Sequence, residues 1–138
     1  MTVSVSKADP IRDTEVVRVY LETQMIPDPV AASAYAAKDF ELTFTGGQKF
    51  DSPAGATNFN ARRYKWVKKK MDRYDTVPGE HETVVYVLGT LYGEWPDGTS
   101  FEGNRYIDRF VVRNGLVVTQ EVWNDSAERL LTQNGIEA

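Results

Sequence analysis

The segment Tyr106-Ile107-Asp108-Arg109-Phe110 contains the residue best placed for chemistry. It lies in a run rich in strand-forming residues, and alternate side chains of a strand point to the same face. Asp108 should therefore share a face with Tyr106 and Phe110. An ionised carboxylate in apolar surroundings is costly, so it must find hydrogen-bond donors or its pKa must rise. Asp108 is then either a group that acts on a bound ligand or a structural carboxylate bonded to a tyrosine.

Two further features could do chemistry, and each also has a plainer interpretation. His81, the only histidine, could serve as an acid or base, but a loop position after Pro78-Gly79 also suits an exposed histidine. The cationic run from Arg62 to Lys70 is typical of a solvated helix face. Arg62 or Arg63 could still reach a pocket mouth and pair with an anionic substrate.

The first half of the chain should supply helices around one strand. Residues 1–10 read as a loose arm. Helices are expected from Asp13 or Thr14, from about Pro29 to Ala37, and from about Pro53 to Asp72 with Ser52 as N-cap. Between the second and third helices, the alternation from Phe40 to Thr45 predicts a half-buried strand with Phe40, Leu42 and Phe44 inward.

The second half reads as a meander. Strands are expected at about Glu82 to Trp95, Thr99 to Val112 and Leu116 to Asn124, with a short helix from Ala127 to Leu131 after them. The alternate set Tyr86, Leu88, Thr90 and Tyr92 could line the covered face, either in contact with a ligand or as simple core packing. Helices gathered on one face of an antiparallel sheet make an α+β fold, and 138 residues suit a single domain.

The turn before the last strand leaves two registers open. A loop of only Asn114-Gly115 places Asp108 opposite Glu121, whereas a loop from Arg113 to Gly115 places it opposite Gln120. We favour the second register, because like charges directly opposite each other are destabilising. Two sets of residues then face opposite ways: Tyr106, Asp108, Phe110, Gln120 and Val122 on the covered face, and Arg105, Arg109, Glu121 and Trp123 on the outer face.

Composition excludes several function classes. A net charge of −4 lacks the basic footprint of general nucleic-acid binding. No apolar run reaches the length of a membrane span. Without cysteine and with one histidine, neither a typical metal cluster nor thiol chemistry is expected. The chain is thus expected to be cytoplasmic, with no cofactor, no nucleic-acid partner and no membrane partner.

The order of helices, strand, helix and meander resembles the NTF2-like superfamily, whose domain is a cone around an internal pocket. The SnoaL-like and ketosteroid-isomerase-like branches are the most similar. Val16-Val17-Arg18-Val19-Tyr20 resembles the first helix of the isomerases, and Tyr106 to Phe110 resembles their segment with the oxyanion-hole aspartate. The stretch from Glu102 to Leu131 is also similar to PhzA/B-type phenazine-biosynthesis proteins. The resemblance implies a curved, mixed, mainly antiparallel sheet.

The resemblance also implies site residues. Tyr20 and Asp108 would be the catalytic pair that holds a developing enolate oxygen. Phe44 stands where isomerases have their general base, and Val122 stands where many SnoaL-like proteins have a carboxylate. The expected substrate-binding residues are Phe40, Phe44, Tyr86, Tyr106, Phe110, Gln120 and Val122.

Three functions follow as hypotheses. The first is a cofactor-free isomerase, cyclase or dehydratase that acts on a hydrophobic carbonyl compound. The second, favoured by Phe44 and Val122, is a non-catalytic protein that binds a hydrophobic small molecule. The third is a protein-interaction domain with a filled cone. The resemblance further implies a homodimer, and an exposed aromatic among paired charges on the outer face, at Arg105, Arg109, Glu121 and Trp123, suits its interface.

Overall fold

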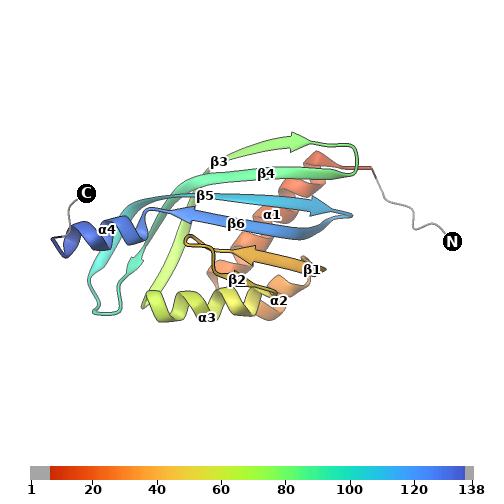
Figure 1. The fold of residues 1–138 in the computed structure, drawn as a ribbon. Helices are drawn as coiled ribbons and strands as arrows, with labels where there is room; N and C mark the ends of the chain where they lie inside the picture. Colours follow the sequence, from red (N-terminus) through yellow and green to blue (C-terminus); the bar gives the residue numbers. More distant parts are fainter. Residues whose placement is uncertain (1–6, 136–138) are drawn as a thin grey trace.

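The computed structural model describes residues 7–135. Along the chain the elements are α1 (Pro10–Met25), α2 (Pro29–Ser33), β1 (Ala36–Thr43), β2 (Lys49–Phe50), α3 (Pro53–Arg63), β3 (Trp66–Pro78), β4 (Glu82–Glu94), β5 (Ser100–Arg113), β6 (Leu116–Asn124) and α4 (Ser126–Gln133). The strands form one sheet in the order β2-β1-β6-β5-β4-β3 (Figure 1).

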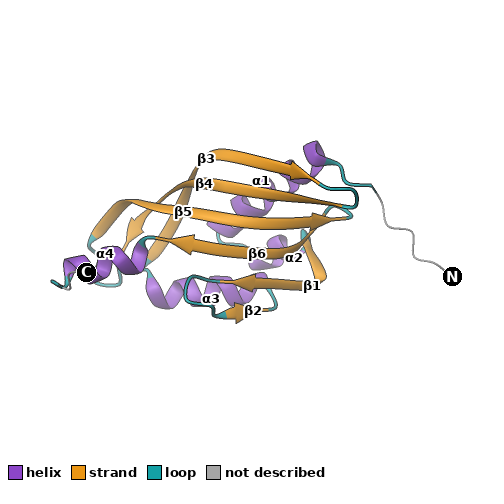
Figure 2. Cartoon of the chain, turned by 45° about the horizontal axis from the view of Figure 1, so that its top comes forward, coloured by secondary structure: helices purple, strands orange, loops and turns teal. Residues whose placement is uncertain are grey.

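The sheet is mixed but mainly antiparallel, because only β1 and β6 run parallel. Helices α1, α2 and α3 lie against the same face, which we call the inner face, and α4 lies at one end of the sheet (Figure 2). The core between these helices and the inner face includes Val17, Leu21, Leu42, Val87 and Phe110, each nearly or fully buried. The predicted α+β class and the curved mixed sheet are confirmed.

The prediction of a helix through Asp72 is wrong. Helix α3 ends at Arg63, and Tyr64 already has extended backbone. From Trp66 the chain forms β3, which pairs with β4 along its length. The inward positions Val67, Lys69 and Met71 alternate with exposed ones. The cationic run therefore divides between a helix end and an edge strand, where the pairing with β4 satisfies the backbone.

Some element boundaries also differ from the predictions. Helix α1 begins at Pro10, because the Asp9 side chain caps it by accepting from the Arg12 amide at 3.1 Å. Of the expected loose arm, residues 1–6 lie outside the described residues, whereas Ala8 donates to the Glu80 carbonyl at 3.0 Å. Helix α2 ends at Ser33 instead of Ala37, since residues 36 and 37 already belong to β1.

Both predicted registers of the last hairpin are wrong at Asp108. The turn has two residues, Asn114 and Gly115, both with positive φ, and the β5–β6 register shifts by one residue where Val111 and Val112 face Thr119 and Val117. This shift brings Asp108 opposite Val122. The division of faces is nonetheless as predicted, because the observed partner Val122 lies two positions from the predicted partner Gln120, and residues two apart on a strand share a face.

Strand β4 faces opposite to the prediction. Thr83, Val85, Val87 and Leu91 are the residues buried on the inner face. The expected set of Tyr86, Leu88, Thr90 and Tyr92 therefore lies on the outer face. There Tyr86 accepts a hydrogen bond from Arg109 Nε at 3.4 Å. Apolar residues occupy both faces of this strand, so the sequence offers no clean alternation.

A glycine allows β3 and β4 to approach closely where the sheet bends. The β3–β4 register shifts between Met71 and Arg73, and a Cβ added at Gly89, opposite this bulge, would lie 1.8 Å from the Lys70 carbonyl oxygen. Gly89→Ala should therefore lower the free energy of unfolding by about 2–3 kcal/mol in urea titrations. The matched control is Gly46→Ala, which meets open space and should cost only the ~1 kcal/mol of its positive φ. Equal losses in both variants would contradict the close approach.

Candidate active site

A cavity of about 230 Å³ lies between the inner face of the sheet and helices α1 and α3. Its walls are mainly apolar, with amides and lysines at a few places. The lining residues are Leu21, Gln24, Met25, Ile26, Pro27, Phe44, Ala56, Thr57, Asn60, Ala61, Tyr64, Lys65, Trp66, Val67, Lys68, Lys69, Leu91, Tyr106, Gln120, Val122 and Asn124. A largely apolar hollow with few polar groups is typical of a small-molecule site.

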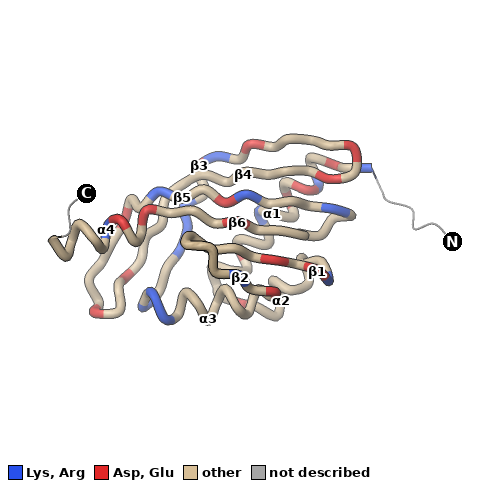
Figure 3. The backbone as a smooth tube through the Cα atoms, viewed as in Figure 1, with Lys and Arg blue, Asp and Glu red and all other residues tan. Residues whose placement is uncertain are grey.

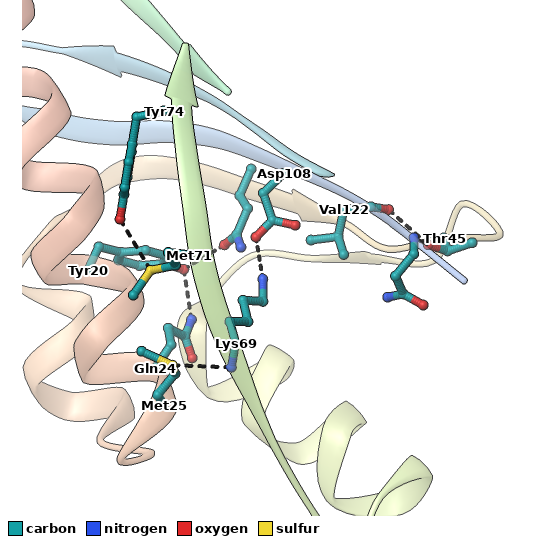
Figure 4. Close-up of polar contacts among 11 residues, drawn as sticks. Tyr20, Gln24, Met25, Thr45, Lys69, Met71, Tyr74, Asp108 and Val122 are labelled. Carbon is teal, nitrogen blue, oxygen red and sulfur yellow. Dashed lines mark hydrogen bonds and ion pairs between the residues drawn. The ribbon is translucent and has the colours of Figure 1, made fainter. Parts of the chain in front are cut away.

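Lys69 and Asp108 form an ion pair in the cavity wall (Figure 4). Lys69 extends from β3, and Asp108 lies on β5 with β4 between the two strands. The side chain of Asp108 is fully buried, whereas that of Lys69 is 19% exposed and lines the cavity. The lysine ammonium also lies 4.8 Å from the centre of the Tyr106 ring. A ligand in the cavity would therefore meet the lysine, with the aspartate behind it.

Burial raises the pKa of the Asp108 carboxyl above its usual range. The Lys69 ammonium and, after it, Gln120 act in the opposite direction by favouring the carboxylate. Burial of either charge alone would carry a large desolvation penalty. The attraction between Lys69 and Asp108 offsets this penalty, so both charges can remain in the cavity wall. Asp108 Oδ1 accepts no hydrogen bond of normal geometry from residues 7–135.

A chain of hydrogen bonds runs behind the cavity from α1 to β6. Gln24 Nε2 donates to the Tyr20 hydroxyl at 2.8 Å, and this hydroxyl donates to Gln120 Oε1 at 2.9 Å. The Tyr20 ring is fully buried and packs edge-on against Phe110, with ring centres 6.0 Å apart. Burial raises the pKa of the Tyr20 hydroxyl. Tyr20 therefore positions two amides that line the cavity without lining it itself.

Tyr106 contributes a different kind of group. Its hydroxyl is buried and finds no hydrogen-bond partner among residues 7–135, although the residue lines the cavity. Burial raises the pKa of this hydroxyl as well, so it stays protonated and can donate. A buried hydroxyl without a partner is costly unless a ligand satisfies it.

The structure thus brings together part of the predicted site. Phe44, Tyr106, Gln120 and Val122, four of the residues predicted to bind substrate, line the cavity. Phe40, Phe110, Tyr20 and Asp108 are buried on the same inner side, behind the lining residues. Tyr86 is on the outer face and is excluded from the cavity.

Lys69 and Gln24 are the functional candidates that the sequence analysis missed. The cationic run around Lys69 predicts a solvated helix face. The alternation of Val67, Lys69 and Met71, with a lysine at an inward place, was the signal that could have revealed it.

Other candidates fall outside the cavity. The His81 side chain is half exposed, 3.6 Å from Glu80 Oε1, and does not line the site. Within residues 7–135, no group of three or more histidine, cysteine, aspartate or glutamate side chains is arranged to hold a metal ion. No helix in this part of the chain is long and apolar enough to cross a membrane.

The outer face of the sheet carries the residues predicted for a dimer interface. Arg109 lies directly opposite Glu121 and pairs with it at 3.2 Å. Trp123, on the same face, is 47% exposed. These positions are as expected, and the homodimer itself stays a prediction.

Solved structures match this architecture over most of its length. An NTF2-like protein of unknown function from Burkholderia pseudomallei aligns with a TM-score of 0.69 and 20% identity, over 86% of this chain and 95% of that one. The chain has the NTF2-like fold. TerC, co-crystallised with polyporic acid, shares this fold with a TM-score of 0.69 and 16% identity, over 86% of this chain and 95% of TerC.

A candidate SnoaL-like polyketide cyclase from Jannaschia sp. CCS1 also has the NTF2-like fold. It aligns with a TM-score of 0.67 and 14% identity, over 95% of each chain. No family model matches the sequence, and no curated protein is detectably similar to it. The expected resemblance to NTF2-like and SnoaL-like proteins is therefore confirmed in the fold, and the fold alone does not specify an activity.

Proposed function

We propose that this protein binds a small, mainly apolar carbonyl compound in the cavity and that Lys69 polarises the carbonyl oxygen. The observation that carries the proposal is the ion pair in the wall of a mainly apolar hollow. Asp108 holds Lys69 from behind, and the lysine side chain reaches the cavity. The likeness in fold to TerC, co-crystallised with polyporic acid, supports an oxygen-bearing ligand.

The geometry supports an electrostatic role for Lys69. An ammonium has three N–H donors, and Asp108 occupies one of them. A donor left for the ligand would stabilise negative charge that develops on a carbonyl oxygen, as in an enolate. Such a preorganised donor in a site shielded from water contributes about 3 kcal/mol to transition-state binding. This chemistry suits an isomerase, cyclase or dehydratase.

Gln24, Gln120 and Tyr106 would orient the ligand. The Tyr20 hydroxyl fixes both amides, and the Tyr106 hydroxyl can donate to a second oxygen. Tyr20 is thus a positioning residue in the proposed reaction. The resemblance implies that Tyr20 and Asp108 hold the substrate oxygen directly. In the proposed reaction they act instead through Gln24, Gln120 and Lys69, which face the cavity.

A second function, binding without chemistry, is favoured by one observation. Among the described residues that line the cavity, none is an aspartate, a glutamate or a histidine. Proton abstraction requires a base within hydrogen-bond reach of the substrate, and Phe44 occupies a place where one was expected. A carrier or sensor of the same carbonyl compound would need only Lys69 and the amides.

The test measures binding first. Polyporic acid and a panel of aromatic ketones are titrated calorimetrically against the wild type and against Lys69→Gln. The control is Lys70→Gln, which changes an exposed lysine that pairs with Asp72 at 4.0 Å and does not line the cavity. Lys69→Gln should weaken binding about tenfold or more, as expected for loss of a charged hydrogen bond, while the control binds as the wild type does. Equal affinities for all three proteins would contradict the role of Lys69.

Turnover then separates the two functions. Each ligand is incubated with protein, and the products are analysed by mass spectrometry. If the protein is an enzyme, Lys69→Gln should lower kcat about 100-fold, and Tyr20→Phe should raise KM more than it lowers kcat because it disturbs orientation. A tightly bound ligand that is recovered unchanged would favour the binding protein over the enzyme.

A further inference from the structure

Lys69 differs from the neighbouring lysines in its surroundings. Lysines and arginines follow one another where α3 ends and β3 begins (Figure 3). Lys65, Lys68 and Lys70 are exposed, whereas the side chain of Lys69 is 19% exposed and lies in the wall of a mainly apolar cavity. Its backbone is held there, because the Lys69 amide donates to Met25 Sδ at 3.3 Å. Lys69 is therefore the lysine of this stretch that a ligand would meet in apolar surroundings.

Asp108 is placed to take a proton from Lys69. Its carboxylate contacts the Lys69 ammonium and is fully buried, and burial raises the pKa of this carboxyl. A proton that moves from the nitrogen to the carboxylate leaves an amine and a carboxylic acid, and neither of them carries the desolvation penalty of a buried charge. An uncharged lysine amine is a nucleophile, and lysines in apolar pockets form imines with carbonyl substrates.

Tyr106 supplies a third group beside this pair. The Lys69 ammonium lies 4.8 Å from the centre of the Tyr106 ring. The Tyr106 hydroxyl is buried and has no hydrogen-bond partner among residues 7–135, so it is available to a ligand oxygen. A donor of this kind stabilises the negative charge that develops on a carbonyl oxygen when an amine attacks the carbon. A nucleophile, a proton acceptor and an oxygen donor thus lie around one part of the cavity.

We propose that Lys69 forms an imine with the carbonyl carbon of the ligand and that Asp108 takes up and returns the proton that this reaction moves. The inference rests on the proposed function, because it requires the carbonyl group to lie at Lys69. It restricts the ligand to aldehydes and ketones. It also adds a covalent intermediate, which divides a difficult reaction into easier steps.

Formation of the imine releases one water molecule and needs no oxidant or reductant. The Lys69 ammonium first gives a proton to Asp108. The nitrogen lone pair then bonds to the carbonyl carbon, the π electrons move to the oxygen, and one of the two remaining nitrogen protons follows them. Asp108 returns its proton to the new hydroxyl, which leaves as water while the nitrogen lone pair forms the C=N bond. The product is an iminium beside the Asp108 carboxylate, so the cavity wall holds one positive and one negative charge before and after.

Reductive trapping tests for the imine directly. The wild type is incubated with limiting 4-methoxybenzaldehyde and sodium cyanoborohydride, which reduces an imine to a stable secondary amine. The labelled protein gains the mass of the aldehyde less one oxygen atom, and peptide mapping locates the modified lysine. Lys69 should carry most of the label, because binding places the carbonyl carbon beside it. The exposed Lys65, Lys68 and Lys70 are internal controls, and a label spread equally over all four lysines would overturn the proposal.

Two variants separate the covalent step from ligand recognition. Lys69→Arg keeps a cation beside Asp108 but forms no imine, so the dominant label should disappear. Asp108→Asn removes the proton acceptor, so trapping at saturating aldehyde should slow about 100-fold. Circular dichroism checks that both variants are folded, and both should still bind 4-methoxybenzamide, whose carbonyl accepts a hydrogen bond but forms no imine. Lys70→Gln should react as the wild type does, and an unchanged rate in Asp108→Asn would overturn the role of the aspartate.

Failure of the imine and failure of the proposed function give different results. If the amide binds and Lys69→Gln weakens it, but cyanoborohydride links no aldehyde to Lys69, the imine is wrong and polarisation of the carbonyl oxygen by Lys69 stands. If neither the aldehyde nor the amide binds to the wild type, the proposed function is wrong and the imine falls with it.

Discussion

Lys69→Met should destabilise the protein by about 3 kcal/mol, toward the lower end of the range for breaking a buried ion pair. The substitution leaves the Asp108 carboxylate fully buried without its cation. Water reaches part of the lysine in the wild type, which is why the lower end of the range applies. Unfolding in urea, followed by circular dichroism near neutral pH, measures the loss.

The partner substitution should behave differently. Asp108→Asn leaves an ammonium that can turn toward the water of the cavity, so its loss should be smaller than that of Lys69→Met. Combining the two substitutions removes both charges and should recover more than half of the loss. Equal losses in the two single variants, with no recovery in the double variant, would show that the pair is not the source of the effect.

The pH dependence of Lys69→Met follows from the same carboxyl. Burial raises the pKa of Asp108 in the folded protein, and in this variant no ammonium opposes the shift. The folded state then binds the proton more tightly than the unfolded state does. Stability should be fully present below the ordinary aspartate pKa of about 4 and decline as the pH rises through the raised value. The double variant with Asp108→Asn should lack this decline.

Phe110→Ala should lower the free energy of unfolding by about 3–5 kcal/mol, as large-to-small substitutions in a core do. The Phe110 ring is completely buried on the inner face and supports the Tyr20 ring from the sheet side. Its removal would leave a void next to the hydrogen bond between Tyr20 and Gln120. Urea unfolding measures the stability.

The control for Phe110 is Phe110→Leu, which keeps most of the volume and should cost about 1 kcal/mol. Ligand affinity should fall in the alanine variant, since Tyr20 would hold Gln24 and Gln120 less firmly. If Phe110→Ala lowers the free energy of unfolding by less than about 1 kcal/mol, neighbouring side chains must move into the space left by the ring without strain, contrary to the prediction.

The sequence was sufficient for most of the fold. Phe40, Leu42 and Phe44 show the alternation of a half-buried strand, and Ser52 before Pro53 marks a helix start, so these predictions were confirmed. The inner-face set around Asp108 was also assigned correctly. Period-2 patterns depend only on neighbours along the chain, which explains why they can be recognised without tertiary information.

The features that were predicted wrongly or missed depend on contacts between residues that are distant in sequence. Trp66, Val67 and Met71 fit a helical spacing as well as a strand, and only the pairing with β4 decides between them. Tyr86 was misplaced because β4 is apolar on both faces. The bulge at Val111 and Val112 has no sequence signal, because the flanking valines suit several registers. The Lys69–Asp108 pair joins residues on strands that are not neighbours in the sheet, so it followed from no local pattern.

The Lys69–Asp108 pair has a consequence for how this protein can evolve. The same lysine that would meet the ligand also ties the edge strand β3 to the centre of the sheet. Substitutions at Lys69 would therefore change ligand recognition and foldedness together, so selection for a new substrate would meet a stability cost there. Thr57 and Asn60 line the cavity from α3. Neither of them belongs to an ion pair that holds the sheet together. Substitutions that change ligand specificity should therefore accumulate first among the residues of α3 that line the cavity, while Lys69 and Asp108 are retained.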